Sequence, residues 1–223
     1  MKLLSYFLGP ETPTFLDNPP VIFRQVSSIL EGGISNWYEI TTINHNGTHI
    51  DVPFHFWQNG PRLTDFTIED FVFNHPLLID IPKGDGELIR SSDLAPYKLQ
   101  FAGSDLLLIR TGAGSYRDTD PARYGRRSPG FHPDAADVLL SSNSKLRALA
   151  FDFPSAASPL RIEEGVKFHQ EVLGQTGRAR YLFLIEDARI DAALSQTDLR
   201  RVLVVPLFLT NLDAAPCTVI AEP

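Results

Sequence analysis

Short runs of apolar residues, often β-branched or aromatic, recur along the chain and predict buried strands. Runs of this length that are bounded by turn-forming residues are typical of strands covered on both faces. We expect such strands over residues 77–81, 106–110, 148–153, 181–186 and 202–209. The segments between them are polar or have helical spacing, so the pattern indicates an α/β fold.

Helix signals separate these strands. Thr67 is followed three residues later by Asp70, immediately before an apolar pair, which resembles a capping box with a shorter carboxylate. Pro133 is expected to open a second helix over 134–141, because proline is well tolerated in a first helical turn. Apolar residues lie roughly one helical turn apart over 162–173, which predicts a third helix.

The first sixty residues follow a different pattern. Four prolines enforce extended or turning backbone before any regular element can begin: Pro10, Pro13, Pro19 and Pro20. We expect this segment to form an arm that wraps over another surface, and its aromatic residues suit an interface beside the functional site.

Composition supports one globular unit. The chain has 223 residues, of which 43% are hydrophobic, enough to fill a sizeable core. No repeat period is found, and no Gly/Ser-rich or Pro-rich stretch is long enough to link independent domains. We therefore expect a compact single α/β domain over residues 1–223.

The charge balance and the cysteine content exclude several classes of partner. The formal net charge is −7 and no basic cluster is present, so nucleic acid is not an expected partner. Cys217 is the single cysteine and has no internal disulfide partner. The apolar stretch over 3–8 is too short for a signal peptide or a membrane span. We expect a cytoplasmic protein that does not bind membranes.

Candidate chemistry is concentrated in the segment HNGTHIDVPFHF. Its polar members His45, His49, Asp51 and His55 are separated by even numbers of residues. Successive side chains alternate between the faces of an extended strand, so all four would project to one side, whereas a helix would split them. Imidazole nitrogens and a carboxylate in one place are ligands that zinc, manganese or iron prefer. The alternative is a polar strand face with scattered histidines.

This segment resembles the signature H-x-G-T-H-x-D-x-P-x-H of the cyclase family of metal-dependent hydrolases, which includes bacterial kynurenine formamidase and isatin hydrolase. Every fixed position of the signature is present. The resemblance continues through SSILEGGISNWYEITTIN, LLLIRTG, SPGFHPDAADVL and AFDFPS, and so covers nearly the whole chain. It implies a mixed, partly barrel-like β-sheet with flanking helices, of the swivelling β/β/α type, and a homodimer or homotetramer.

The resemblance also implies roles for the four residues of the signature. His45, His49 and Asp51 are similar to the family's ligands of one metal ion, with Asp51 able to bridge to a second ion. His55 is similar to the family's proton-transferring histidine. The expected cofactor is therefore a divalent metal, zinc or manganese, as one or two ions.

Two later residues are similar to those that complete the family's metal site, namely His169 and Glu186. The segment between them is longer than in the family pattern, so Glu171 and Asp187 are alternatives. Independently of the resemblance, Glu186 ends an apolar strand pattern, where an unpaired buried carboxylate would be costly. Phe15 stands where kynurenine formamidases have a tryptophan against their aromatic substrate.

The leading functional hypothesis is hydrolysis of a small amide, formamide or cyclic amide, such as N-formylkynurenine, isatin or a lactam. A divalent metal would activate water and polarise the carbonyl, and His55 would move the proton. Apolar walls beside the metal would come from Phe54, Phe56 and Trp57, and the expected substrate-binding residues are Phe15, Phe54 and Trp57. Two alternatives are an iron-dependent oxygenase with a two-histidine, one-carboxylate site and a non-catalytic metal- or ligand-binding homologue.

Overall fold

The computed structural model describes residues 1–101, 103–141, 145–178 and 180–223. Within these ranges, the centre of the protein is a nine-stranded sheet in the order β5-β12-β13-β4-β11-β10-β8-β6, with β1 beside β13. Its strands are β1 (Lys2–Leu3), β4 (His49–Asp51), β5 (Val72–Phe73), β6 (Pro76–Asp80), β8 (Leu106–Arg110), β10 (Ala148–Phe151), β11 (Phe183–Glu186), β12 (Arg201–Pro206) and β13 (Ala214–Glu222).

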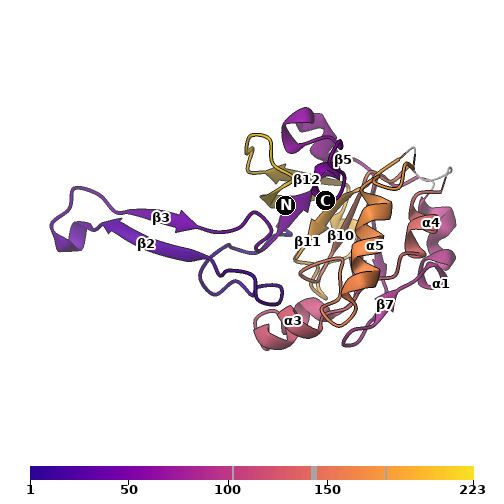
Figure 1. The fold of residues 1–223 in the computed structure, drawn as a ribbon, viewed down its shortest axis with the longest axis horizontal. Helices are drawn as coiled ribbons and strands as arrows, with labels where there is room; N and C mark the ends of the chain where they lie inside the picture. Colours follow the sequence, from indigo (N-terminus) through magenta and orange to yellow (C-terminus); the bar gives the residue numbers. More distant parts are fainter. Residues whose placement is uncertain (102, 142–144, 179) are drawn as a thin grey trace.

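The sheet is mixed, and β4 joins its two halves. Strands β6, β8, β10 and β11 are parallel to one another. Strand β4 is antiparallel to both β11 and β13, and β13 is antiparallel to β12. The sheet is nearly closed, which confirms the expected barrel-like α/β architecture. Because β1 pairs with β13, the two termini lie close together (Figure 1).

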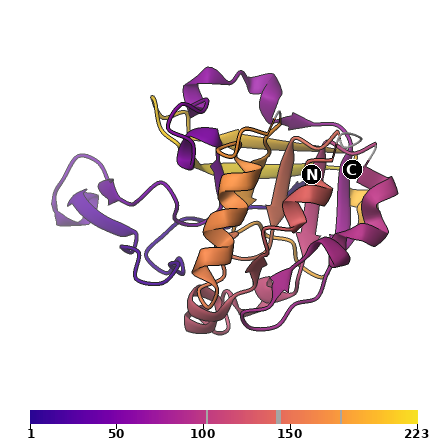
Figure 2. The ribbon, with the colours of Figure 1, turned by 45° about the vertical axis from the view of Figure 1, so that its right-hand side comes forward.

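Helices cover one face of the parallel half of the sheet, and α5 is the longest of those described (Figures 1 and 2). The short strands β7 (Leu88–Ile89) and β9 (Gly130–Phe131) form a separate pair beside them. None of the described helices combines the length and apolar character that a membrane span requires. The helices are α1 (Ser91–Leu94), α2 (Lys98–Phe101), α3 (Pro121–Arg127), α4 (Ala135–Leu139) and α5 (Ile162–Val172).

Alternating residues of the central strands feed two apolar cores, one on each face of the sheet. Leu107 and Leu149 pack with Phe168 of α5 on the helix-covered face. Their neighbours Leu108 and Ala150 belong to the core on the opposite face. Strands buried on both faces explain why the sequence shows continuous apolar runs instead of strict alternation.

The predicted elements are found with small shifts of their ends. Strand β8 has the predicted bounds, and the other four predicted strands correspond to β6, β10, β11 and β12. The helices predicted over 134–141 and 162–173 are α4 and α5. The capping contact from the Thr67 backbone to the Asp70 carboxylate is present at 2.8 Å, but it opens a four-residue 3-10 helix, Ile68–Phe71.

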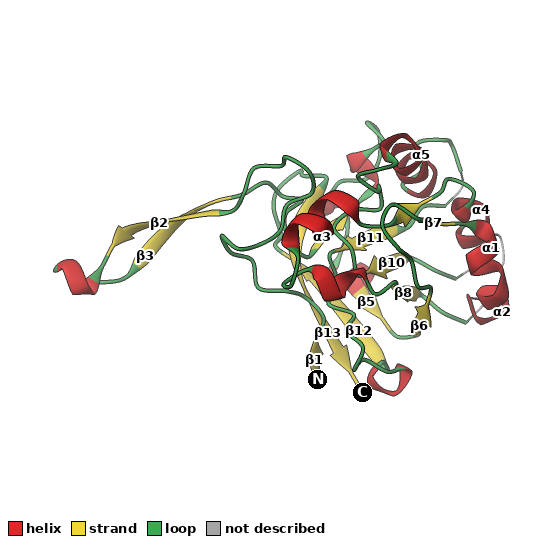
Figure 3. Cartoon of the chain, turned by 90° about the horizontal axis from the view of Figure 1, so that it is seen from below, coloured by secondary structure: helices red, strands yellow, loops and turns green. Residues whose placement is uncertain are grey.

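Part of the N-terminal segment forms a ribbon that projects far from the sheet (Figures 1 and 3). Strands β2 (Ile22–Ser27) and β3 (Trp37–Thr41) pair with each other and, among the described residues, with no other strand. The residues before the ribbon run along the body of the protein, where the carbonyl oxygen of Thr14 lies against Gly125 of α3. The residues before the ribbon therefore pack against the body of the same chain, whereas the ribbon extends away from it.

Candidate metal centre

Strands β4 and β11 place three ionisable side chains on the helix-covered face of the sheet. Ile50 of β4 points into the core on the opposite face, so His49 and Asp51 point towards the helices. Glu186, the last residue of β11, is paired with His49 across the antiparallel ladder. Directly opposed residues have their Cβ atoms close together, so the two strands deliver these side chains to one place.

The expectation that one extended strand carries all four residues of the signature is wrong. Strand β4 contains only His49–Asp51; His45 lies in the preceding turn, and His55 ends a 3-10 helix, Pro53–His55. Gly47 makes the first bend with a φ of +68°, and a Cβ there would lie 2.9 Å from a methyl carbon of Leu8. Two bends, rather than one strand face, bring the imidazoles together.

Asp51 lies at the centre of the resulting cluster. Its Oδ1 atom is 3.1 Å from His45 Nδ1 and 3.4 Å from His49 Nε2, and its Oδ2 atom is 3.9 Å from His55 Nε2. His49 Nε2 is also 3.3 Å from Glu186 Oε2. The side chains of Asp51 and His49 are almost fully buried, whereas those of His45 and His55 are 21% and 24% exposed. The inner end of the cluster is thus buried, and its outer rim faces solvent.

Helix α5 supplies His169 from its buried face. The Nε2 atom of His169 is 3.4 Å from Glu186 Oε1, and its Nδ1 atom is 2.8 Å from the carbonyl oxygen of Gly165. Phe56 stacks on the His169 ring at 4.7 Å between centroids. Glu186 Oε1 also accepts a hydrogen bond from the backbone of Ala156 at 2.8 Å. Both predicted members of the second half of the site therefore lie in the cluster.

The two alternative carboxylates are occupied elsewhere. Glu171 accepts a hydrogen bond from Arg178 at 2.5 Å on the outer side of α5. Asp187 is buried and accepts two hydrogen bonds from Arg117, each 2.8 Å long, together with one from Tyr124. Neither carboxylate faces the imidazoles in the way that Glu186 does.

The cluster contains polar atoms whose bonding within the protein is incomplete. Among the described residues, His49 Nε2 and both carboxylate oxygens of Asp51 are buried without a hydrogen-bond partner. The other ring nitrogen of His49 is 2.8 Å from the Gly47 carbonyl, so it carries the proton and leaves Nε2 with a lone pair. Buried polar atoms of this kind need a partner, and a cation coordinated by nitrogen and oxygen would supply it. The donor set therefore fits a divalent metal.

Mutual attraction between imidazoles and carboxylates dominates the electrostatics of the cluster. Burial alone would lower the pKa of His45, but the carboxylates of Asp51 and Asp213 raise it to about 10. Burial is likewise outweighed at His49 and His169, whose pKa values are raised by neighbouring carboxylates. Burial would raise the pKa of Asp51, but the surrounding imidazoles hold it well below its usual range. Attraction between the imidazoles and the carboxylates therefore stabilises the arrangement of these side chains.

Metal affinity should consequently rise with pH. The pKa of His45 is raised to about 10, so this imidazole holds a second proton at neutral pH that a metal ion must displace, and the raised pKa values of His49 and His169 act in the same direction. Competition weakens as the pH increases towards about 10, the pKa of His45, and strengthens as the pH falls. Calorimetric zinc titrations in buffers of different ionisation enthalpy should detect protons released on binding at pH 7. Affinity that is unchanged between pH 6 and pH 8 would contradict this prediction.

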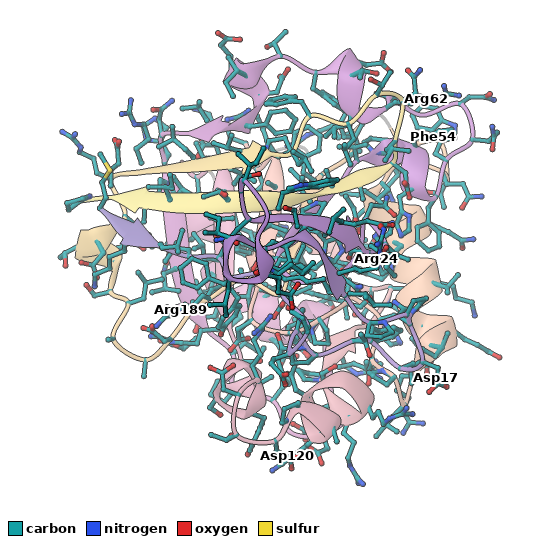
Figure 4. All side chains as sticks on the ribbon, turned by 90° about the vertical axis from the view of Figure 1, so that its left-hand side faces the viewer. Asp17, Arg24, Phe54, Arg62, Asp120 and Arg189 are labelled. Carbon is teal, nitrogen blue, oxygen red and sulfur yellow. The ribbon has the colours of Figure 1, made fainter. Side chains whose placement is uncertain are left out.

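The predicted substrate-binding aromatics are placed less centrally. The Phe54 ring is covered by the guanidinium of Arg62 at 4.3 Å from its centroid, and both lie near the surface (Figure 4). Trp57 packs beside Gly174 and lines a surface cavity with Tyr181. Phe56, by contrast, contacts His55 as well as His169. Phe56 is therefore an aromatic wall of the cluster.

Asp213 is a member of the cluster that the sequence did not reveal. Its Oδ2 atom is 2.8 Å from His55 Nδ1 and 3.0 Å from His45 Nε2. Asp213 is 158 residues away from His55 along the chain. In the sequence it is an aspartate in a turn before a strand, a position where this residue type is common. Its role depends on the pairing of β13 with β4, which no local signal predicts.

Comparisons with known proteins place the chain in a family. A family model named Cyclase matches residues 3–158, more than half of the chain. The chain belongs to the cyclase family. A kynurenine formamidase of Bacillus cereus is 30% identical over 220 residues, which cover 99% of this chain and 96% of the formamidase. The resemblance carried by the histidine signature is thereby confirmed.

Solved structures show the same fold. An isatin hydrolase bound to the product analogue thioisatinate superposes with a TM-score of 0.80 at 16% identity, covering 99% of this chain and 92% of the hydrolase. A structure described as a potential metal-dependent hydrolase with cyclase activity gives a TM-score of 0.73 at 21% identity, covering 100% and 98%. The cyclase-family chain thus shares its architecture with these hydrolases over nearly its whole length.

Proposed function

We propose that this protein is a metal-dependent hydrolase that uses water to cleave the carbon–nitrogen bond of an amide, a formamide or a cyclic amide. The observation that carries the proposal is the buried cluster around Asp51, in which atoms suited to metal coordination lack partners and His55 stands beside them. Relatives named kynurenine formamidase and isatin hydrolase support the same class of reaction.

His45, His49 and Asp51 would hold one metal ion. Their ligand atoms lie within 4.8 Å of one another. A second ion would share Asp51 and use His169 and Glu186, which face each other at the buried end of the cluster. Mixed nitrogen and oxygen ligands suit zinc or manganese.

In the proposed reaction, the bound metal supplies Lewis acidity, which lowers the pKa of water and polarises the substrate carbonyl. His55 accepts the proton that water loses as its oxygen adds to the carbonyl carbon. The same imidazole then gives the proton to the leaving nitrogen as the carbon–nitrogen bond breaks, so atoms and charge balance. Phe56 packs perpendicular to the His55 ring, at 4.7 Å between centroids, and so occupies one side of it.

Neither alternative function is favoured by a specific observation. An oxygenase built on His49, Asp51 and His169 would leave His45 and His55 without a role, and the parallel half of the sheet with α5 differs from the jelly roll expected for such an enzyme. A non-catalytic homologue would not require an imidazole held 3.9 Å from the central carboxylate.

A substrate screen tests the proposed function. The protein would be stripped with a chelator, reloaded with zinc or manganese, and offered N-formylkynurenine, isatin and simple lactams. We expect hydrolysis of at least one compound by the loaded protein and none by the stripped protein. Phe15, Phe54 and Trp57 remain proposed substrate contacts, and alanine variants of them should then raise KM. Absence of hydrolysis across the panel, or equal rates with and without metal, would contradict the proposal.

The β2–β3 ribbon supports a homodimer or homotetramer as the working form. A two-stranded ribbon is marginally stable in water on its own, and this one exposes apolar side chains along its length. Arg24 and Glu39 on its two strands pair with each other, and Glu31 near the tip is the one other charged residue of the ribbon. A second copy of the chain offers matching apolar surface, including exposed Phe7 and Leu207 beside a cavity. The exposed apolar residues of the ribbon are Ile22, Phe23, Val26, Ile29, Leu30, Ile34, Trp37, Tyr38 and Ile40.

Charge placed at the tip of the ribbon should break this assembly. Leu30 and Ile34 are 96% and 100% exposed, so aspartate at both positions costs nothing in the single chain but would be buried in a dimer. Light scattering coupled to size exclusion should give a dimer or tetramer for the natural protein and a monomer for the double variant. Leu99→Asp, at an equally exposed leucine of α2, serves as the control and should assemble normally. A monomeric natural protein would contradict the proposal.

A further inference from the structure

Asp213 is anchored at the point where β13 meets the end of β4. Ala214, the next residue, pairs with Asp51 in the β4–β13 ladder. The backbone carbonyl of Asp213 accepts a hydrogen bond from the amide of Val52 at 2.9 Å. The main chain on both sides of the cluster is therefore tied together, and the Asp213 side chain starts from a fixed position.

The carboxylate of Asp213 interacts with three neighbouring side chains. Its Oδ1 atom accepts a hydrogen bond from the side-chain amide of Asn44 at 2.8 Å. Its Oδ2 atom lies 2.8 Å from His55 Nδ1 and 3.0 Å from His45 Nε2. An ionised carboxylate only accepts hydrogen bonds, so both of these ring nitrogens carry protons.

The protonation of one ring nitrogen fixes the state of the other. With its proton on Nδ1, neutral His55 has its lone pair on Nε2, the nitrogen that points to Asp51 Oδ2 at 3.9 Å. In its neutral, metal-binding form, with the proton on Nε2, His45 likewise turns the lone pair of Nδ1 towards Asp51 Oδ1, at a distance of 3.1 Å between the two atoms. One carboxylate therefore aims two imidazole lone pairs at the centre of the cluster.

We propose that Asp213 is the positioning residue for the proton-transferring imidazole: it fixes the Nδ1–H tautomer and the ring orientation of His55, and it orients His45 for metal binding. The effect of Asp213 on catalysis rests on the proposed function, whereas its control of the His55 tautomer does not. Carboxylates that hold an imidazole in this way typically contribute roughly 10–100-fold to metal affinity or activity.

The test combines imidazole spectra with kinetics in Asp213→Ala and Asp213→Asn. Long-range ¹⁵N–¹H NMR of the zinc-bound natural protein should show His55 protonated at Nδ1, with its signals assigned through His55→Gln. We expect Asp213→Ala to mix the His55 tautomers and to lower kcat roughly 10–100-fold, with KM changed only a few-fold. Asp213→Asn keeps an acceptor oxygen and should be intermediate; it also serves if the alanine variant does not fold. Asp118→Asn, at a carboxylate whose side chain is 82% exposed, is the matched control.

Two outcomes would overturn the proposal. One is a His55 tautomer and a kcat that both stay unchanged in Asp213→Ala. The other is loss of zinc from that variant with an unchanged His55 tautomer, which would make Asp213 a metal ligand. If the natural protein hydrolyses no amide, the proposed function fails, and the spectra of the zinc-bound protein still decide the role of Asp213.

Discussion

Asp51→Asn should remove metal binding and hydrolysis together. Both carboxylate oxygens of Asp51 are buried without a hydrogen-bond partner among the described residues, and His45, His49 and His55 all face them. Substitution of residues that merely support metal ligands costs about 10–100-fold in affinity or activity, so loss of the central ligand should exceed that range. Asparagine has nearly the same shape as aspartate and lacks its charge, so the losses in this variant measure the contribution of the negative charge. Elemental analysis of the purified variant and its kcat/KM measure both losses.

A matched exposed position separates this effect from general damage. Asp17, whose side chain is 87% exposed and paired with Arg126, can be changed to asparagine outside the cluster. Asp17→Asn should keep natural metal content and rate. An Asp51→Asn protein that retained stoichiometric metal and full activity would show that the cluster is not the metal centre.

His55→Gln should abolish most turnover while leaving the metal in place. The Nε2 atom of His55 is 3.9 Å from Asp51 Oδ2, near the ligands, but the partner of its Nδ1 atom is Asp213. Loss of a group that transfers protons in the transition state typically lowers the rate about 10²–10⁴-fold. Steady-state kinetics on the amide identified by the screen, together with elemental analysis, measure the two quantities separately.

The two ways in which the His55 prediction can fail have different meanings. If His55→Gln loses metal along with activity, His55 is a ligand and the proton-transferring group must be another residue. If the variant stays fully active, the hydrolytic mechanism is wrong. His75→Gln provides the control, because His75 is exposed in the loop before β6 and should be dispensable.

Elements whose burial is continuous could be predicted from the sequence. Strand β8 is buried along nearly its whole length, and its apolar run marks both of its ends. Helix α5 buries one stripe that includes Phe168 and His169, which gives a clear helical period. The N-terminal ribbon could not be predicted in this way, because its apolar residues are exposed and no alternation of buried and exposed positions marks its strands. The cytoplasmic location and the single-domain boundary remain predictions of the sequence.

The candidate site could be predicted only in part from the sequence, for a related reason. The spacing of His45, His49, Asp51 and His55 marks a cluster, but the even spacing suggested one strand where the chain makes two bends. Glu186 could be found because a carboxylate at the end of an apolar run needs a partner. Asp213 left no comparable signal, since its partners are brought to it only by long-range strand pairing.

An anomalous-difference map from crystals of the active, metal-loaded protein, recorded at the absorption edge of the bound metal, would locate the metal directly. We predict a peak within about 2.0–2.2 Å of ligand atoms of His45, His49 and Asp51, as expected for zinc with nitrogen and oxygen ligands. A second peak between Asp51, His169 and Glu186 would establish a two-metal centre. An active, stoichiometrically loaded crystal whose anomalous peaks all lie away from Asp51 would show that the cluster is not the metal centre.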